Sequence, residues 1–307
     1  MEWEGRNSLM DMPTEQTLRR RILYRPRSFI ATARLQALLA VRRGDRMSPH
    51  IFIVGAQKAG TTSLFRDLAN HPQIIAPVAK EIHQFDRHKM RPLDNYLAHF
   101  PSLQDAEERM RRVDAPVMTM DCTPYYFMHP QAAERISAFC PDAKIIVMLR
   151  DPCARAWSHY WHEVARGFET LEPEAAFAAE AERIIKPHDH VGPDRQARFA
   201  HQHYSYCARS EYDVQISRWQ ALFRSDQLLF IATERYQQNP AAERDRIAAF
   251  LAIGPFAHAQ DQGRLNEGRY PAPAPAMAAW LDQRLHRSRE RTRAMLGVDF
   301  GWPTWRG

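Results

Sequence analysis

Cysteine is scarce in this chain of 307 residues, and its four copies show neither C-x-x-C spacing nor a paired metal-binding pattern. We therefore expect free thiols in a reducing compartment rather than disulfides. A secretory signal and long apolar runs are also missing. The longest weakly polar stretch near the start, residues 28–41, is shorter than the ~20 apolar residues that span a bilayer. These absences argue against a disulfide scaffold and predict a cytoplasmic protein.

The charge balance is basic, with a formal net charge of +6. An anionic ligand is one explanation, and a generally basic surface is the other. Residues 1–48 form a basic, partly helical arm in this interpretation. The arm packs on the domain or, alternatively, makes weak contact with an acidic membrane surface. No internal repeat or long linker follows, so we expect residues 49–307 to form a single domain.

Strand-like apolar runs alternate with helical stretches from residue 51 onward. The expected strands are residues 51–55, 115–121, 144–150 and 227–233, followed in turn by helices at 61–70, 130–139, 153–166 and 241–251. This alternation predicts an α/β fold with a mostly parallel central sheet flanked by helices. Ligands of such sheets bind at the carboxyl ends of strands, so the following loops are the candidate site. Residues 184–207 lack clean periodicity, and we expect them to cover or border that site.

The run FIVGAQKAGTTSLFRDL (52–68) has the form of a phosphate-binding loop but lacks its usual lysine. Gly55 and Gly60 keep the G-x-x-x-x-G spacing, whereas the lysine, Lys58, lies inside the loop instead of after the second glycine. Backbone N–H groups of such a turn and the helix N-terminus behind it can hold a phosphate. The missing Lys-Ser/Thr pair disfavours ATP hydrolysis, and an ordinary strand-to-helix turn remains an alternative.

The segment GAQKAGTTSL resembles the phosphosulfate-binding loop of sulfotransferases that use 3′-phosphoadenosine 5′-phosphosulfate (PAPS). It is most similar to the carbohydrate-acting group, which includes the heparan sulfate sulfotransferases and bacterial relatives. The resemblance implies a P-loop-like sulfotransferase fold. It also implies that Lys58 stabilises charge on the bridging oxygen as the sulfur–oxygen bond breaks. The residues assigned to the donor phosphosulfate are Lys58, Ala59, Gly60, Thr61 and Thr62.

Residues 144–162, KIIVMLRDPCARAWSHYWH, are similar to the family's 3′-phosphate segment. The resemblance assigns the 3′-phosphate contact to Arg150 and Ser158. A guanidinium at a strand end offers a planar set of donors to a phosphate. Ser158 lies about two turns into the helix that Pro152 begins. The alternative is a structural ion pair between Arg150 and Asp151.

Residues 76–88, APVAKEIHQFDRH, resemble the family's acceptor segment. The resemblance makes Glu81 the general base, with His83 as second choice. Its acceptor-site neighbours are Lys80, His83 and Asp86. A carboxylate and an imidazole two residues apart on an extended chain project to the same side. Gln84 stands where the family often has an aromatic residue, which puts the shape of the acceptor wall in question, and a solvated charged loop is the alternative.

Two further matches are looser. MDCTPYYF (120–127) looks like the family's E-K-S/T-P-x-Y-F segment and places Thr123 in the acceptor site. Cys122 replaces the family's lysine, so Lys80 or Arg87 would have to supply that cation. NEGRYP (266–271) resembles a basic loop that closes over the 3′-phosphate, with Glu267 where the family tends to have lysine. Its donor contacts would be Gly268, Arg269 and Tyr270.

The resemblance predicts transfer of a sulfuryl group from PAPS to a hydroxyl or amine of a glycan, a glycolipid or a small molecule, with no metal. Two other classes remain open. An atypical nucleotide-dependent phosphotransferase would need magnesium, and a non-catalytic basic module would bind polyanions. We expect no nucleic-acid partner. A zinc site is a weak alternative, because its histidines form two H-x-H pairs without nearby cysteines. These histidines are His188, His190, His201 and His203.

Overall fold

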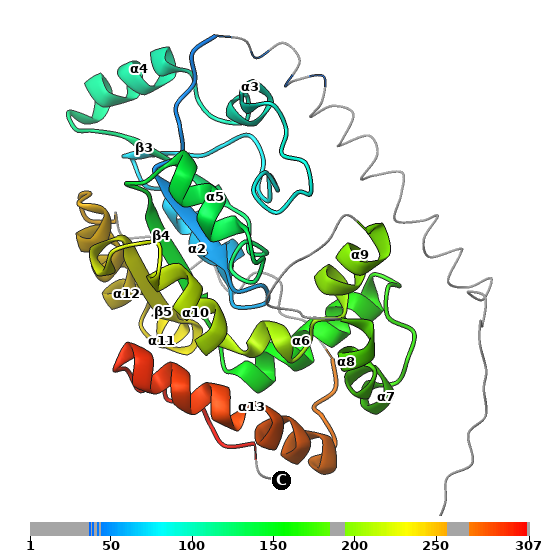
Figure 1. The fold of residues 1–307 in the computed structure, drawn as a ribbon. Coiled ribbons are helices and arrows are strands. Elements are labelled where there is room, and N and C mark those ends of the chain that lie inside the picture. The colour runs from blue at the N-terminus through cyan, green and yellow to red at the C-terminus, as the bar shows by residue number, and fades with distance from the viewer. Residues whose placement is uncertain are drawn as a thin grey trace, which may run out of the picture.

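The computed structural model describes residues 37, 39, 42, 44–184, 194–256 and 270–305, and a parallel sheet lies at their centre (Figure 1). Its strands are β1 (Ile51–Gly55), β2 (Ile74–Ile75), β3 (Met118–Cys122), β4 (Lys144–Leu149) and β5 (Leu228–Ala232). Their order is β2-β3-β1-β4-β5, and every pair is parallel. The predicted α/β fold is therefore confirmed.

Helices surround this sheet. They are α2 (Thr61–Ala69), α3 (Leu93–Leu97), α4 (Leu103–Val113), α5 (Ala132–Phe139), α6 (Pro152–Ala165), α7 (Pro173–Ala178), α8 (Glu180–Arg183), α9 (Arg195–His203), α10 (Tyr212–Gln220), α11 (Thr233–Gln238), α12 (Pro240–Leu251) and α13 (Pro275–Leu296). In Figure 1, α13 runs beneath α10 and α6 and contacts both, and α7 to α9 gather beside α6.

Two apolar clusters hold the sheet and α6. The larger cluster surrounds the sheet, whose strand β1 is buried along its whole length, as expected of a parallel sheet covered on both faces. The second joins α6 to α7 and α13. At the start of α6, Pro152 occupies the first turn and the Asp151 carboxylate accepts a hydrogen bond from Ala154 N at 2.7 Å. The first turn of α6 is thus anchored at the carboxyl edge of the sheet.

Several elements lie outside the predicted set. β2 has two residues and α7 has six, which is too short to show a periodicity. α9 lies in the stretch without clean periodicity, because two histidines on its buried face obscure the apolar pattern. α4 is also absent from the predictions, although a capping box marks its start.

The described end of the basic arm packs on the domain. Arg42 donates to the carbonyl oxygens of Ala98 at 2.8 Å and Phe100 at 2.7 Å. Most of residues 1–48 lie outside the described residues, so membrane contact by the arm stays a prediction. No helix within the described ranges is both long enough and apolar enough to cross a bilayer. All four cysteines are unpaired, as expected.

Candidate active site

The loop between β1 and α2 has a shape that requires its two glycines. A Cβ on Gly55 would lie 2.5 Å from Phe127 Cβ, so only glycine fits this close approach. Gly60 has φ +86°, in the left-handed region that favours glycine. No side chain caps α2, so the first N–H groups of the helix, at Thr61 and Thr62, remain open toward the loop. These are the features of a phosphate-binding turn.

Lys58 and Arg150 meet at the carboxyl edge of the sheet. Arg150 directly follows β4, and its Nη1 donates to the carbonyl oxygen of Lys58 at 3.2 Å. The Ala56 N–H donates to Met148 O in β4 at 2.7 Å and so ties the loop to the same strand. The two segments that the sequence relates to phosphate binding therefore lie side by side.

Positive charge gathers around this loop. Burial and then the Arg150 guanidinium lower the pKa of Lys58, with a smaller contribution from Arg155, while Glu163 and Glu81 oppose the shift. Arg155 is fully buried, and burial lowers its pKa to about 10. Cations held this close repel one another, and an anion between them would relieve the repulsion. The loop region is therefore complementary to an anionic ligand.

Two side chains from distant elements form hydrogen bonds to the loop. Arg209, which is 1% exposed, hydrogen-bonds to the Gln57 side chain and donates to Gln202 O at 2.8 Å. The Thr233 hydroxyl, at the start of α11, donates to Ala59 O at 2.7 Å. These contacts fix the loop before a ligand binds.

Two other predicted donor contacts are associated with α6. Ser158 is buried two turns into the helix. The Tyr270 ring stacks on Trp161 of α6, with 6.3 Å between centroids and 8° between planes. Gly268 and Arg269 lie outside the described residues, so their roles remain predictions.

The segment that carries Glu81 is pinned to the end of β3. The Glu81 N–H donates to Cys122 O at 3.0 Å. Lys80 Nζ lies 2.9 Å from Glu81 Oε1, and His83 Nε2 lies 3.9 Å from Oε2. His83 Nδ1 in turn hydrogen-bonds to Asp86. The Glu81 carboxylate, 49% exposed, thus lies between an ammonium and an imidazole.

The prediction that this segment is extended is wrong. Glu81 and His83 have left-handed backbones, with φ 61° and 56°, so their side chains meet because the chain curls. Gln84 closes the curl: its Nε2 donates to Arg91 O at 2.9 Å, and its backbone N–H donates to the Tyr126 hydroxyl at 2.9 Å. Gln84 is buried, and these contacts use its side chain within the loop. Its side chain therefore shapes the loop.

Neighbouring charges separate the protonation of the two candidate bases. Burial would raise the pKa of Glu81, but Lys80 and then His83 lower it below its ordinary value. Burial would lower the pKa of His83, but Asp86 and then Glu81 raise it. A carboxylate with a lowered pKa is ionised at neutral pH, whereas an imidazole with a raised pKa retains its proton more readily. Glu81 is therefore the better placed proton acceptor.

Cys122 is a buried thiol beside α2. Its Sγ lies 3.8 Å from Thr61 O, and burial raises its pKa to about 12. The positive charge of Lys80 acts in the opposite direction and lowers the pKa of this thiol. Arg87 is exposed and donates through Nε to His83 O at 2.7 Å. Of the two cations considered as substitutes for the family's lysine, Lys80 is the one that acts electrostatically at this position.

A buried carboxylate supports the acceptor segment. Asp121 accepts hydrogen bonds from Tyr96 Oη at 2.9 Å, Tyr126 Oη at 3.1 Å and Thr123 Oγ1 at 2.7 Å. Burial raises its pKa to about 6. Thr123 is fully buried and donates to Asp121, and Asp86 is bonded to His83, so both side chains have partners within the protein. A direct substrate contact by either one stays a prediction.

Three residues of the α6 region interact electrostatically with Lys58 or Glu81, although the sequence reasoning did not select them. They are His162, Glu163 and Arg166. Burial and then the Lys58 charge lower the pKa of His162 to about 4, and the charge of Glu81 reaches the same imidazole. His162 follows Ser158 by four positions, so both lie on one face of the helix. That spacing was the available signal.

The two described histidines of the weak zinc alternative have other partners. His203 Nδ1 donates to the buried Glu163 Oε2 at 2.9 Å, and His201 Nδ1 lies 2.5 Å from the Tyr125 hydroxyl. Among the residues that the structure describes, no three His, Cys, Asp or Glu side chains are grouped as metal ligands. His188 and His190 lie outside those residues.

Known proteins resemble this chain in sequence and in fold. The sulfotransferase domain family model matches residues 48–262. Human heparan sulfate glucosamine 3-O-sulfotransferase 6 is 32% identical over 215 residues, which cover 70% of this chain and 55% of that protein. Human heparan sulfate glucosamine 3-O-sulfotransferase 3A1 is 30% identical over 220 residues, 70% of this chain and 47% of the relative.

A crystal structure of a sulfotransferase from Alicyclobacillus acidocaldarius aligns with a TM-score of 0.63 and 26% identity, covering 82% of this chain and 97% of that one. The chain spans about half the length of the two curated relatives. The family model, in contrast, covers more than half of the chain, including the phosphate loop, the Glu81 segment and Arg150. This chain belongs to the sulfotransferase domain family.

Proposed function

We propose that this protein is an enzyme that transfers a sulfuryl group from PAPS to a hydroxyl group of a glycan. The hydrogen bond from Arg150 to the Lys58 carbonyl carries the proposal, because it brings two cationic segments to one place. A donor with a 5′-phosphosulfate and a 3′-phosphate needs two such segments. The acceptor segment with Glu81 joins them from β3, which neighbours β1.

PAPS supplies an activated sulfuryl group when it is bound. In this proposal Lys58, the loop N–H groups and the first turn of α2 hold the phosphosulfate end. Arg150 and Ser158 hold the 3′-phosphate, as the family resemblance implies. The cationic surroundings of Lys58 support this assignment, since two phosphate groups would offset the mutual repulsion of the cations.

Glu81 takes the proton of the acceptor hydroxyl, and the acceptor oxygen forms a bond to sulfur. The bond from sulfur to the bridging oxygen breaks, and its electron pair leaves with the 5′-phosphate. Lys58 and the loop N–H groups stabilise the charge that develops there. The products are a sulfate ester, 3′,5′-adenosine bisphosphate (PAP) and a proton on Glu81.

The names of the two curated relatives support a glycan hydroxyl as acceptor, because both are heparan sulfate glucosamine 3-O-sulfotransferases. Charges near Glu81 agree with an acidic glycan. Lys80 and, more weakly, Arg166 lower the pKa of Glu81, so positive charge surrounds the point where the acceptor would bind.

Calorimetric titration with PAP and with ATP, each with and without magnesium, tests the donor. We expect PAP to bind more tightly than ATP and independently of magnesium. Labelled sulfate transfer from PAPS to acidic and neutral oligosaccharides then tests the acceptor. Preference for magnesium–ATP would replace this proposal with a phosphotransferase, and PAP binding without transfer to any glycan would refute the acceptor class.

A further inference from the structure

Side chains from later elements hold the turn that carries Arg150. The Tyr212 hydroxyl donates to Arg150 O at 3.0 Å, and the Asp151 N–H donates to Glu234 Oε1 at 2.9 Å. The Ser210 hydroxyl donates at 2.9 Å to the carbonyl oxygen of the proline that follows Asp151. The backbone direction at Arg150 is thus set by contacts far away in the sequence.

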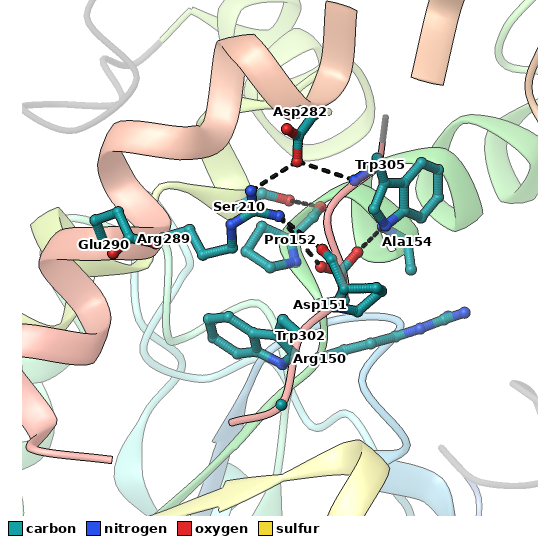
Figure 2. Close-up of polar contacts among 12 residues, drawn as sticks. Arg150, Asp151, Pro152, Ala154, Ser210, Asp282, Arg289, Glu290, Trp302 and Trp305 are labelled. Carbon is teal, nitrogen blue, oxygen red and sulfur yellow. Dashed lines mark hydrogen bonds and ion pairs between the residues drawn. The ribbon is translucent and has the colours of Figure 1, made fainter. Parts of the chain in front are cut away.

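The Asp151 carboxylate connects this turn to α13, as Figure 2 shows. One oxygen caps α6, and the other lies 3.9 Å from Arg289 Nη1. Arg289 is 2% exposed and donates to Asp282 Oδ1 at 2.6 Å and to Pro303 O at 3.0 Å. Moving a buried guanidinium with these partners would leave charges unpaired, so Asp151 has a rigid neighbour.

The residues after α13 close over the same contact. The Trp302 indole N–H donates to Glu234 Oε2 at 3.2 Å. Glu234 therefore bridges the Trp302 ring and the Asp151 backbone. The backbone N–H of Trp305 donates to Asp282 Oδ1 at 3.2 Å. This bond joins the residues after α13 to the ion pair between Arg289 and Asp282. In Figure 2, the Arg150 side chain points away from this network.

We propose that Arg289 and residues 300–305, here named the clasp, position the Arg150 guanidinium for the 3′-phosphate of the donor. The inference rests on the proposed function, in which Arg150 contacts that phosphate. Because the guanidinium is at the end of a long side chain, a small rotation of the turn displaces it strongly and spoils its hydrogen-bond geometry. Arg289 and Trp302 are thus positioning residues that act through Arg150.

A purely structural ion pair makes a different prediction. It would lower stability and weaken every adenosine ligand alike. Positioning of Arg150 instead weakens only ligands that carry a 3′-phosphate. PAP has this group and adenosine 5′-phosphosulfate lacks it, so the two ligands separate the explanations.

The test uses Trp302→Phe, which removes the indole N–H but keeps a buried ring, and Arg289→Met. Arg284→Met is the matched control, because it breaks another α13 ion pair, to Glu211 at 2.7 Å. By calorimetry we expect both clasp variants to bind PAP at least about tenfold more weakly, with adenosine 5′-phosphosulfate within about twofold of wild type. The control should match wild type for both ligands.

Kinetics provide a second readout. The KM for PAPS should rise in the clasp variants, while kcat at saturating donor stays near wild type, because the Lys58 loop is also held by the Ala56 bond to Met148 O and the Thr233 bond to Ala59 O. Arg289→Met added to Arg150→Ala should cause no further loss of PAP affinity.

Equal losses of affinity for both ligands would overturn the positioning role of the clasp. Wild-type PAP affinity in the folded clasp variants would overturn it as well. If circular dichroism shows that Arg289→Met does not fold, Trp302→Phe decides the question. A wild-type protein that binds PAP no better than adenosine 5′-monophosphate, which differs from PAP only in lacking the 3′-phosphate, would instead refute the role of Arg150 and thereby the proposed donor site.

Discussion

Of the five non-glycine residues that have a left-handed backbone in the described part of the chain, three are Lys58, Glu81 and His83. This conformation costs a residue with a Cβ roughly 1–2 kcal/mol, so it persists only where the surroundings enforce it. The Arg150 bond to the Lys58 carbonyl and the Glu81 bond to Cys122 O are such contacts. The side chains proposed for catalysis therefore have set directions before substrate binds.

Replacing Lys58 tests its role as the cation beside the leaving phosphate. We expect Lys58→Ala to lower turnover by roughly 10²–10³, about 3–4 kcal/mol, as loss of one preorganised donor does elsewhere. Steady-state kcat with PAPS measures this loss of turnover. Lys89→Ala is the control, because Lys89 is an exposed lysine just after the acceptor segment. Wild-type turnover in Lys58→Ala would remove the lysine from the mechanism.

The pH dependence of transfer distinguishes Glu81 from His83 as the base, because the base must be deprotonated. The pKa of Glu81 is lowered, so with Glu81 as base kcat/KM should stay level from pH 7 down to the ordinary glutamate value, roughly 4.3. The pKa of His83 is raised above 6.5, so with His83 as base the decline begins above that pH. Glu81→Gln should keep PAP affinity and lose transfer.

Local motifs were enough to select Lys58, Arg150 and Glu81 from the sequence, because each stands in a short segment with a characteristic pattern. The structure brings Lys58 into contact with Arg150, as two phosphate segments of one site require. His162 escaped selection, because its place depends on which face of α6 turns toward the loop. The curl at Glu81 escaped too, since a positive φ in a residue other than glycine leaves no pattern in the sequence.

Among the elements, α2, α5, α6 and α12 were predictable because each follows an apolar strand, whereas α11, which starts directly after β5, was not predicted. The short helices α7 and α8 were not predictable. The buried face of α9 carries two histidines, which obscure its apolar pattern. The loop from β1 to α2 is the element on which the proposed donor site depends. It packs so closely on the chain after β3 that its first glycine has no room for a methyl group.

Gly55→Ala tests that close packing. Its Cβ would lie 2.5 Å from Phe127 Cβ and 3.0 Å from Pro124 O, so the loop must shift. We expect a loss of about 1–3 kcal/mol in the free energy of unfolding, typical of overpacking, together with weaker PAP binding. Denaturant unfolding and calorimetry measure the two effects. In Gly44→Ala, where a Cβ meets nothing within 4 Å, PAP affinity should not change.

Across the whole molecule, residues from widely separated parts of the chain hold the segments of the proposed site. Arg209 reaches the phosphate loop, Glu234 reaches the Arg150 turn, and Arg289 reaches Asp151. Such contacts depend on the packing of helices around the sheet, so no local sequence pattern reveals them. Only the basic net charge, +6, gave a global indication of an anionic ligand.

Ligand binding should stabilise the whole fold. At a concentration of 100 times its Kd, PAP should add about 2.7 kcal/mol to the free energy of unfolding and raise Tm by several degrees. Thermal unfolding with PAP, with ATP and without ligand measures the shift, which added salt should reduce because the contacts are ionic. Equal shifts with PAP and ATP would contradict a site specific for the 3′-phosphate.

The bridge from Trp302 through Glu234 to the Asp151 backbone has a consequence for biosynthesis. A ribosome makes the tryptophan long after it has made Arg150, so a nascent chain can have its sheet while this indole is still inside the exit tunnel. The proposed donor site would then be completed only after the sheet has formed. A chain truncated just before Trp302 would then lack this bridge, and we expect it to hold the proposed donor more weakly.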